Sequence, residues 1–183
     1  MRTSPENVIL IGMPGAGKST VGVLLARALG LDFTDTDLLI QRREGMSLQD
    51  LVDTRGHQAL RHIEAEVLRQ VSLRGHVIAT GGSAVYSEAA MTALRTTGVI
   101  VHLHVDLPVI RARVTDFDTR GIARAAGQSI EDLYREREAL YHQHADVGVD
   151  VSTTDQAGAV KAVIAALQKI NALPAGSGIM PRS

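Results

Sequence analysis

The sequence predicts an α/β fold of three layers, in which helices cover both faces of a parallel sheet. Short apolar runs alternate along the chain with segments whose apolar residues recur at helical spacing, which is typical of strand–helix units. Two of these runs, residues 77–79 and 99–101, are apolar throughout, and this indicates strands that are buried on both faces. Right-handed crossovers between such strands produce an open parallel sheet, which binds ligands at the carboxyl ends of its strands.

The periodicity predicts a five-stranded parallel sheet flanked by helices. We expect strands over residues 7–11, 32–35, 76–80, 99–104 and 147–151. We expect helices over residues 18–29, 36–44, 47–53, 56–73, 87–97, 107–116, 129–144 and 155–170. Ser47 and Ser129 are each followed three residues later by an aspartate, which is typical of a helix start.

The length of the chain, 183 residues, suits one domain with a sizeable core, which we assign to residues 1–171. The apolar fraction of 45% and the charged fraction of 21% are those of a globular protein. Residues 172–183 are rich in glycine and proline, so we expect them to form a disordered tail.

Charge and composition argue against several classes of function. The net charge of −1 gives no electrostatic support for binding nucleic acid or an anionic membrane, and an aromatic content of 3% provides few stacking surfaces. No apolar run approaches the roughly 18 residues of a membrane span, and the first residues lack the apolar core of a signal peptide. The absence of cysteine excludes disulfides and thiolate chemistry and is compatible with the cytoplasm, where we expect this protein.

The most informative motif is Gly12-Met-Pro-Gly-Ala-Gly-Lys-Ser-Thr20, which fits the phosphate-binding loop G-x-x-x-x-G-K-S/T. It lies between an expected strand and an expected helix, so backbone N–H groups and the helix N-terminus would face the phosphates. We expect Lys18 to reach the β- and γ-phosphates of ATP and the Ser19 hydroxyl to bind Mg²⁺. A glycine-rich turn without a ligand is the alternative. The expected nucleotide-binding residues are Gly12, Gly15, Ala16, Gly17, Lys18, Ser19 and Thr20.

Asp35 and Asp37 follow the second expected strand, at the edge of the sheet where ligands bind. One carboxylate can hold Mg²⁺, which prefers oxygen ligands. The other can accept a proton from the hydroxyl group of a substrate. The alternative is a helix N-cap next to a solvated acid.

Three further elements suggest a binding site for a second substrate. Arg61 and Glu64 lie three residues apart on an expected helix, so the carboxylate could orient the guanidinium to grip a ligand carboxylate. Gly81 and Gly82 follow the third expected strand and permit close approach of the backbone to a ligand. Arg137 is a further charge on a later helix. A surface ion pair, a tight turn and an exposed charge are the respective alternatives.

Residues 116–128 show no sustained periodicity and contain Gly121, Gly127, Arg120 and Arg124. A basic loop of this length in a compact domain is usually functional. We expect a mobile lid over the nucleotide phosphates, with a plain surface loop as the alternative. We call residues 116–128 the lid segment.

Together these features resemble the shikimate kinase family, from about residue 8 to residue 167. The matching features are the phosphate loop, Asp35-Thr36-Asp37, Gly45-Met46-Ser47, Gly56 with Arg61 and Glu64, Ala79-Thr80-Gly81-Gly82, Arg120, and Arg137 with Leu140-Tyr141. The resemblance implies a three-layer P-loop kinase fold with a mobile lid, and transfer of the ATP γ-phosphate to the 3-hydroxyl of shikimate. It also favours a monomer.

The resemblance further implies the roles of individual residues. Asp37 is expected to bind the ring hydroxyls and act as the base, and Asp35 to lie near Mg²⁺. Arg120 is expected to approach the phosphates from the lid. The residues that would bind shikimate are Asp37, Arg61, Gly81, Gly82 and Arg137.

The chain departs from the family pattern around the acceptor and in the lid. Ser83 replaces a third glycine, Leu60 replaces an aromatic residue, and Arg120-Gly121-Ile122-Ala123 replaces Arg-Pro-Leu-Leu. A kinase of a related polyol, cyclitol or sugar acid is therefore an alternative, as is a non-catalytic nucleotide-binding switch module. Arg124 is close enough in sequence to share the role of Arg120.

The seven histidines show no metal-binding motif such as H-E-x-x-H. His102 and His104 alternate on one expected strand and face the same way, and His142 and His144 lie near a helix end. We interpret these residues as structural or solvated.

Overall fold

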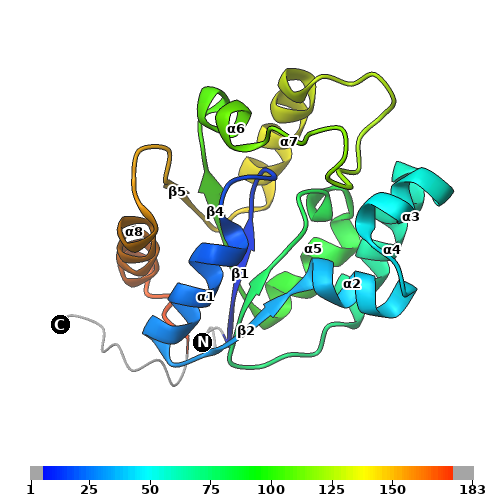
Figure 1. Ribbon diagram of the computed structural model, residues 1–183. Helices are drawn as coiled ribbons and strands as arrows, with labels where there is room; N and C mark the ends of the chain where they lie inside the picture. The colour runs from blue at the N-terminus through cyan, green and yellow to red at the C-terminus, as the bar shows by residue number, and fades with distance from the viewer. Residues whose placement is uncertain (1–5, 175–183) are drawn as a thin grey trace.

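A computed structural model describes residues 6–174 and confirms the predicted five-stranded sheet (Figure 1). The strand order is β2-β3-β1-β4-β5, and every neighbouring pair is parallel. The strands are β1 (Asn7–Ile11), β2 (Asp32–Asp35), β3 (His76–Ala79), β4 (Gly98–His104) and β5 (Val147–Asp150). β1 lies at the centre, and its residues are fully buried, as an apolar strand covered on both faces should be.

All eight predicted helices are present within residues 6–174. They are α1 (Lys18–Leu29), α2 (Thr36–Glu44), α3 (Leu48–Arg55), α4 (His57–Gln70), α5 (Glu88–Thr97), α6 (Leu107–Arg113), α7 (Ile130–His144) and α8 (Gln156–Lys169). A short 3₁₀ helix, η1 (Ala84–Tyr86), was not predicted. The predicted ends at residues 73 and 116 were wrong, because α4 ends at Gln70 and α6 at Arg113. Val114 leaves the helix and packs its buried side chain against the phosphate loop at Gly15.

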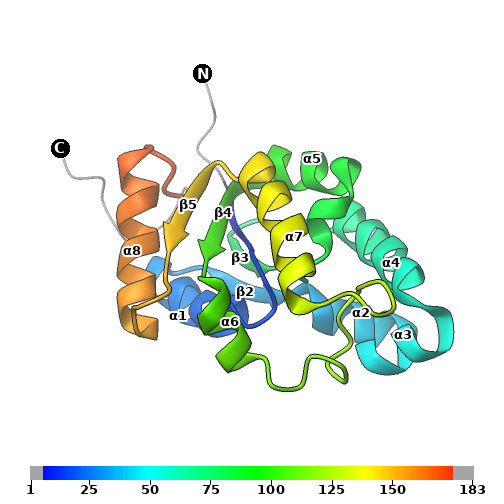
Figure 2. The same ribbon diagram turned by 90° about the horizontal axis from the view of Figure 1, so that it is seen from above.

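The helices form two layers around the sheet (Figures 1 and 2). α1 and α8 pack side by side on one face, whereas α5 and α7 cover β4 on the other, with α4 packed against α5. α2 and α3 pack on α4 around a second apolar cluster that contains Ile40, Leu51, Leu60 and Ala123. Ala123 belongs to the lid segment, so this cluster joins the lid segment to α2–α4.

The lid segment connects α6 to α7 and runs across to α3 (Figure 2). The amide of Gly121 donates a 2.6 Å hydrogen bond to Oε1 of Gln49 on α3. Gly121 has φ of +67°, and a Cβ there would lie 2.6 Å from the Gln49 nitrogen. The close approach and the left-handed backbone together require glycine at this position.

The first residues of the expected tail pack on the domain. The Ala172 amide donates to the carbonyl of Leu167, and Ala172 and Leu173 contact the main core. The remainder of that expectation, residues 175–183, lies outside the described residues. Within the described part of the chain, no helix combines the length and the apolar character needed to cross a membrane.

Candidate active site

The phosphate loop joins β1 to α1 with its backbone held close to neighbouring segments. A Cβ on Gly12 would lie 2.7 Å from the carbonyl oxygen of Leu103, and one on Gly15 would lie 2.6 Å from Cγ2 of Val114. Both glycines also have positive φ, of +147° and +84°. Any side chain at these positions would therefore push the loop out of place.

Lys18 begins α1 and is nearly buried beneath the loop. Its Nζ donates to the carbonyl oxygens of Gly12 at 2.7 Å and Met13 at 2.9 Å. Burial lowers the pKa of Lys18 to about 8, and the negative charge of Asp37 opposes that effect. The ammonium is held at the loop by backbone carbonyls, which a phosphate could replace as hydrogen-bond partner.

Ser19, Asp35 and Asp37 come together at the carboxyl ends of the strands. The Ser19 hydroxyl donates to Oδ2 of Asp35 at 2.5 Å, and Oδ1 of Asp35 accepts from the Asp37 amide at 3.0 Å. Asp35 is thus the N-cap of α2, as the alternative interpretation held, and at the same time lies beside Ser19. The two expected Mg²⁺ ligands therefore form one cluster of oxygen donors.

Asp37 and Glu64 are the acids with perturbed ionisation in this site. Burial raises the pKa of Asp37 to about 6, the nearby charge of Asp35 adds to the rise, and Lys18 and Arg120 oppose it. Burial raises the pKa of Glu64 to about 7, with a further contribution from Asp37. Carboxyl groups with raised pKa values that face one cleft are typical of acid–base sites.

The predicted pairing of Arg61 with Glu64 was wrong. Within residues 6–174 no ion pair joins them, because Glu64 turns inward and accepts a hydrogen bond from the Ser83 hydroxyl. Arg61 instead stacks on the ring of Tyr86, with its guanidinium carbon 3.6 Å from the ring centroid. Helical spacing places Arg61 and Glu64 on the same side of α4, but each side chain contacts a residue that follows β3.

Arg61 and Arg137 nevertheless converge on one hydrogen-bond acceptor. Nη2 of Arg61 lies 3.3 Å and Nη2 of Arg137 lies 2.7 Å from the carbonyl oxygen of Ala123. Arg137 is almost fully buried, and its Nε is 3.4 Å from the Tyr86 hydroxyl. A backbone oxygen of the lid segment thus occupies the point where the two guanidinium groups meet.

Gly81 and Gly82 lie under the side chains of the site. A Cβ on Gly81 would be 2.4 Å from Oε1 of Glu64 and 2.7 Å from Oδ1 of Asp37, and one on Gly82 would be 2.6 Å from Nη1 of Arg137. The two glycines are needed so that the carboxylates and the guanidinium can reach this edge of the sheet. The Tyr141 hydroxyl donates to the Gly82 carbonyl at 2.7 Å and holds the turn to α7.

These groups surround a cavity of about 350 Å³ between the phosphate loop and the lid segment. Arg61, which contacts the Ala123 carbonyl, is not among the described residues that line the cavity. Leu60, Ser83 and Arg113 also line it, whereas the predicted residues Gly12, Ala16 and Asp35 are not among the described lining residues. The predicted residues that line it are Gly15, Gly17, Lys18, Ser19, Thr20, Asp37, Gly81, Gly82, Arg120 and Arg137.

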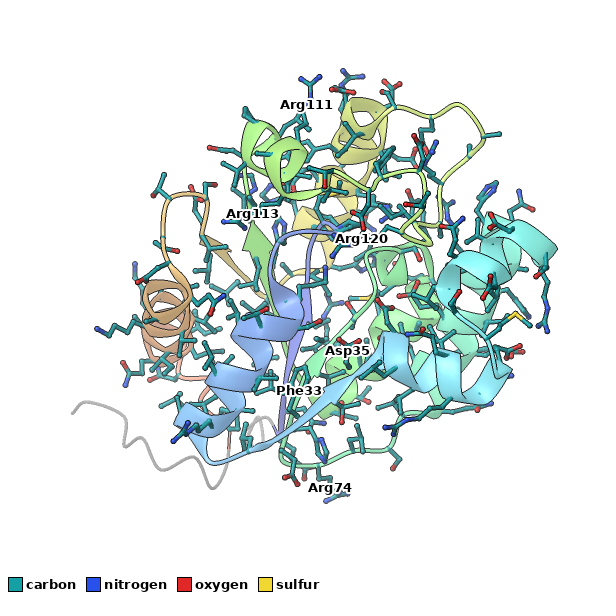
Figure 3. The ribbon with its side chains drawn as sticks, in the orientation of Figure 1. Phe33, Asp35, Arg74, Arg111, Arg113 and Arg120 are labelled. Carbon is teal, nitrogen blue, oxygen red and sulfur yellow. The ribbon has the colours of Figure 1, made fainter. Side chains whose placement is uncertain are left out.

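Arg113, at the end of α6, and Arg120, in the lid segment, line the cavity together with the phosphate loop. Arg120 pairs with Asp116 at 3.4 Å, and Arg113 donates to the Gly15 carbonyl at 3.3 Å. Figure 3 labels both arginines. Arg124 instead bonds to Asp118 and the Gln128 carbonyl within the lid segment. Sequence reasoning missed Arg113, which carried no signal beyond a basic residue near a helix end.

Comparison with known proteins agrees with this arrangement. The family model described as Shikimate kinase matches residues 14–168. The chain belongs to the shikimate kinase family. It is 38% identical to a shikimate kinase of Geobacter sulfurreducens, over 80% of this chain and 82% of that protein. It is 34% identical to shikimate kinase 2 of Pectobacterium atrosepticum, over 82% of this chain and 90% of that protein.

The fold also matches a solved member of the family. The shikimate kinase of Acinetobacter baumannii, solved in complex with shikimate, superposes with a TM-score of 0.81 at 28% identity, covering 91% of this chain and 93% of that one. The departures from the shikimate kinase pattern are accommodated locally. Ser83 bonds to Glu64, and Tyr86 supplies an aromatic surface next to the arginines although position 60 is leucine.

Proposed function

We propose that this protein is an ATP-dependent kinase that transfers the γ-phosphate of ATP to the 3-hydroxyl of shikimate. One observation carries the proposal: the phosphate loop and the acceptor-side residues Asp37 and Arg137 line the same cavity. Membership of the shikimate kinase family supports the activity, and similarity to the Acinetobacter shikimate kinase, which was solved with shikimate bound, supports the acceptor.

The donor half of the reaction depends on the phosphate loop. Lys18 would exchange its bonds to the Gly12 and Met13 carbonyls for bonds to the β- and γ-phosphates of ATP. Arg120 would approach the γ-phosphate from the lid segment and stabilise its developing charge. The residues proposed to contact ATP are Gly12, Gly15, Ala16, Gly17, Lys18, Ser19, Thr20 and Arg120.

The residues at the loop fit a bound Mg²⁺. Ser19 Oγ and Asp35 Oδ2 lie 2.5 Å apart, and both are the hard oxygen donors that Mg²⁺ prefers, directly or through its waters. When bound with ATP, the ion would neutralise phosphate charge.

The acceptor half depends on Asp37 and the two arginines. Asp37 is ionised above its pKa of about 6 and would accept the proton of the 3-hydroxyl of shikimate while the oxygen of that hydroxyl forms a bond to the γ-phosphorus. The bond from the γ-phosphorus to the β–γ bridging oxygen breaks in the same step, and ADP leaves. Gly81 and Gly82 would line the ring of shikimate, since they lie beside Asp37 and Arg137.

Binding of the shikimate carboxylate requires a movement of the lid segment. Arg137 and Arg61 now donate to the Ala123 carbonyl, and a carboxylate would take its place as a stronger, charge-assisted acceptor. The lid segment would then be free to close over the phosphates and exclude water. The cytoplasmic location and the monomeric state remain predictions.

An assay of ADP release with a panel of acceptors tests the proposal. Turnover should appear with shikimate and be absent with quinate, with gluconate and without an acceptor. Lys18→Ala and Asp37→Asn should abolish it, whereas Lys161→Ala, on the exposed surface of α8, should retain it. Turnover with another acceptor alone would favour the related polyol or sugar-acid kinase. ATP binding without turnover on any acceptor would favour the switch module.

A further inference from the structure

His102 is a fully buried histidine whose ring nitrogens have no hydrogen-bond partner within residues 6–174. An imidazole must leave water to be buried, and that costs free energy unless its nitrogens are paired. Oε1 of Glu138 is also buried without a hydrogen bond and lies 3.4 Å from Nε2 of His102. Each group therefore has the other as its neighbour at a distance that is long for a hydrogen bond, and a cation bound between them would give both a closer partner.

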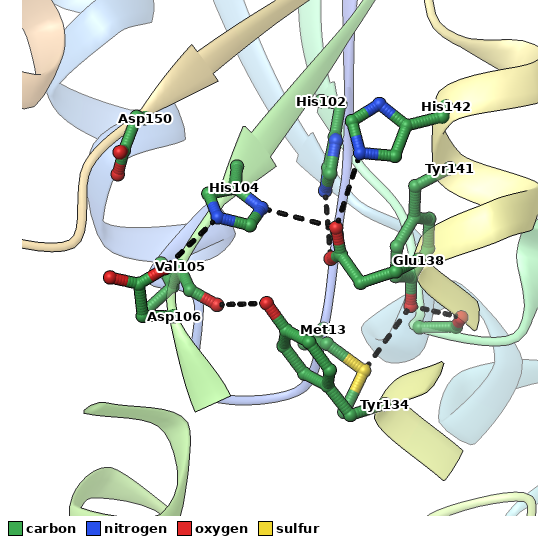
Figure 4. A network of polar contacts seen from close by, with 12 residues as sticks. Met13, His102, His104, Val105, Asp106, Tyr134, Glu138, Tyr141, His142 and Asp150 are labelled. Carbon is green, nitrogen blue, oxygen red and sulfur yellow. Dashed lines mark hydrogen bonds and ion pairs between the residues drawn. The ribbon is translucent and has the colours of Figure 1, made fainter. Parts of the chain in front are cut away.

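The two groups belong to a cluster between β4 and α7, shown in Figure 4. His102 comes from β4, whereas Glu138 and His142 lie four residues apart on one face of α7. Nε2 of His142 lies 3.5 Å from Oε2 of Glu138. One ligand atom from each of the three residues lies within 4.8 Å of the other two. We call these three residues the β4–α7 cluster.

The spacing of the cluster suits a tetrahedral cation. Zinc binds histidine nitrogen and carboxylate oxygen at about 2.0–2.2 Å, which places neighbouring ligand atoms roughly 3.4 Å apart. Nε2 of His102 lies 3.4 Å from Oε1 of Glu138, and Nε2 of His142 lies 3.5 Å from Oε2, so each imidazole stands at about this edge length from one oxygen of the carboxylate. Two imidazoles and one carboxylate are also a donor set that zinc uses with an open fourth position.

The surroundings of the cluster resemble those that orient metal ligands. Nδ1 of His104 lies 3.1 Å from Oε2 of Glu138, and its Nε2 lies 3.2 Å from Oδ1 of Asp106. His104 thus holds Glu138 in place from outside the cluster. Tyr141 stacks on His102 with ring centroids 5.1 Å apart and fixes that ring from the other side. The His142 side chain is 70% exposed, so a cation can reach the cluster from solvent.

We propose that the β4–α7 cluster binds one divalent transition-metal cation of the zinc type. His102, Glu138 and His142 supply the three protein ligands, and water takes the fourth position. The site is separate from the Ser19–Asp35 pair, because Tyr141 lies between His102 and the Gly82 carbonyl at the acceptor site. Its imidazole donors select against Mg²⁺, which prefers oxygen.

Calorimetric titration of the tag-free protein with Zn²⁺, without nucleotide or shikimate, tests the proposal. We expect one bound equivalent, and a melting temperature that rises with Zn²⁺ because the cation binds the folded state. His142→Gln, at an exposed position, should weaken binding by about tenfold or more. Co²⁺ in place of Zn²⁺ should give the visible absorption of a tetrahedral site, and His142→Gln should remove it.

The chain offers a matched control on α4. His62 is 73% exposed and lies 3.4 Å from Glu66, four residues further along that helix, so it reproduces a His–Glu pair without a third ligand. His62→Gln and Ser19→Ala should each leave the Zn²⁺ affinity within about twofold of the original. Absence of binding at about 100 μM Zn²⁺, a condition well above the affinities of structural zinc sites, would overturn the proposal. Equal losses in His142→Gln and His62→Gln would overturn it as well.

Discussion

Arg137 donates a 2.7 Å hydrogen bond from Nη2 to the carbonyl oxygen of Ala123, a residue of the lid segment. Arg61 contacts the same oxygen at 3.3 Å. A buried arginine needs acceptors for its N–H groups, and in this conformation the backbone of the lid supplies one. If the two arginines bind the acceptor as proposed, shikimate and Ala123 would compete for the same guanidinium groups, and acceptor binding would depend on the position of the lid segment.

Arg61→Ala should raise the KM for shikimate and leave kcat nearly unchanged. The guanidinium would contact the carboxylate equally in the ground state and the transition state, so its loss removes uniform binding. A hydrogen bond to a charged group contributes about 1.5–3 kcal/mol, so we expect the KM to rise roughly 10- to 100-fold. Arg69→Ala, at an exposed position of the same helix, is the control. An unchanged KM in Arg61→Ala would reject the carboxylate role.

The acid limb of the pH profile should report Asp37. Burial raises its pKa to about 6, and the proposed base must be ionised. We therefore expect kcat/KM for shikimate, at saturating ATP, to fall about tenfold per pH unit below pH 6. Glu64 has a pKa of about 7 and is the competing assignment. The decrease of kcat/KM at acid pH should persist in the Glu64→Gln variant. If this decrease disappears in the variant, the ionisation belongs to Glu64 and not to Asp37.

Much of the fold was predictable because helices, strands and caps depend mainly on residues that are close together in the sequence. Helical periodicity and apolar runs gave helix and strand positions to within a few residues, and Ser47 and Ser129 cap α3 and α7 as predicted. The phosphate loop and the clustering of Ser19 with Asp35 followed from one motif and from the parallel sheet. η1 was missed because three residues with no periodicity give no signal.

The errors in the predicted site concern contacts between side chains from segments that are separated in the sequence. Glu64 binds Ser83 and Arg61 stacks on Tyr86, and both partners follow β3, far along the chain from α4. The β4–α7 cluster was missed for the same reason: His102 and Glu138 are brought together by the packing of α7 on β4, and no short motif records that contact.

Glu64→Gln should stabilise the protein at pH 8 relative to the original. Glu64 has an ordinary pKa of 4.5 and a folded-state pKa of about 7, so the folded state holds the proton more tightly than the unfolded chain. The original protein therefore loses stability as the pH rises from about 4.5 through 7. Glutamine is neutral at every pH and can still accept from Ser83, so it avoids this loss.

Urea unfolding at pH 5 and pH 8 measures the effect. The stability difference between Glu64→Gln and the original should grow from pH 5 to pH 8. Glu66→Gln, on the same helix, is the matched control, because the hydrogen bond from Arg43 lowers the pKa of Glu66 and the carboxylate is favourable when ionised. Glu66→Gln should give no gain at pH 8. A difference for Glu64→Gln that does not change with pH would contradict the assignment.

Gln49→Ala should loosen the lid segment. Oε1 of Gln49 accepts the 2.6 Å hydrogen bond from the Gly121 amide and ties the lid to α3. A net hydrogen bond contributes about 0.5–1.5 kcal/mol, so amide exchange in the lid around Gly121 should become roughly 2- to 10-fold faster. Hydrogen–deuterium exchange measures this directly, with Gln70→Ala, at an exposed position of α4, as the control.

The same variant also tests the competition between the lid and the acceptor. Once the tie to α3 is lost, the conformation in which Ala123 accepts from Arg137 is less favourable, so shikimate displaces that carbonyl at lower cost. The KM for shikimate should fall in Gln49→Ala while the KM for ATP changes less. Faster exchange with an unchanged KM for shikimate would show that Ala123 and the acceptor carboxylate do not compete for Arg137.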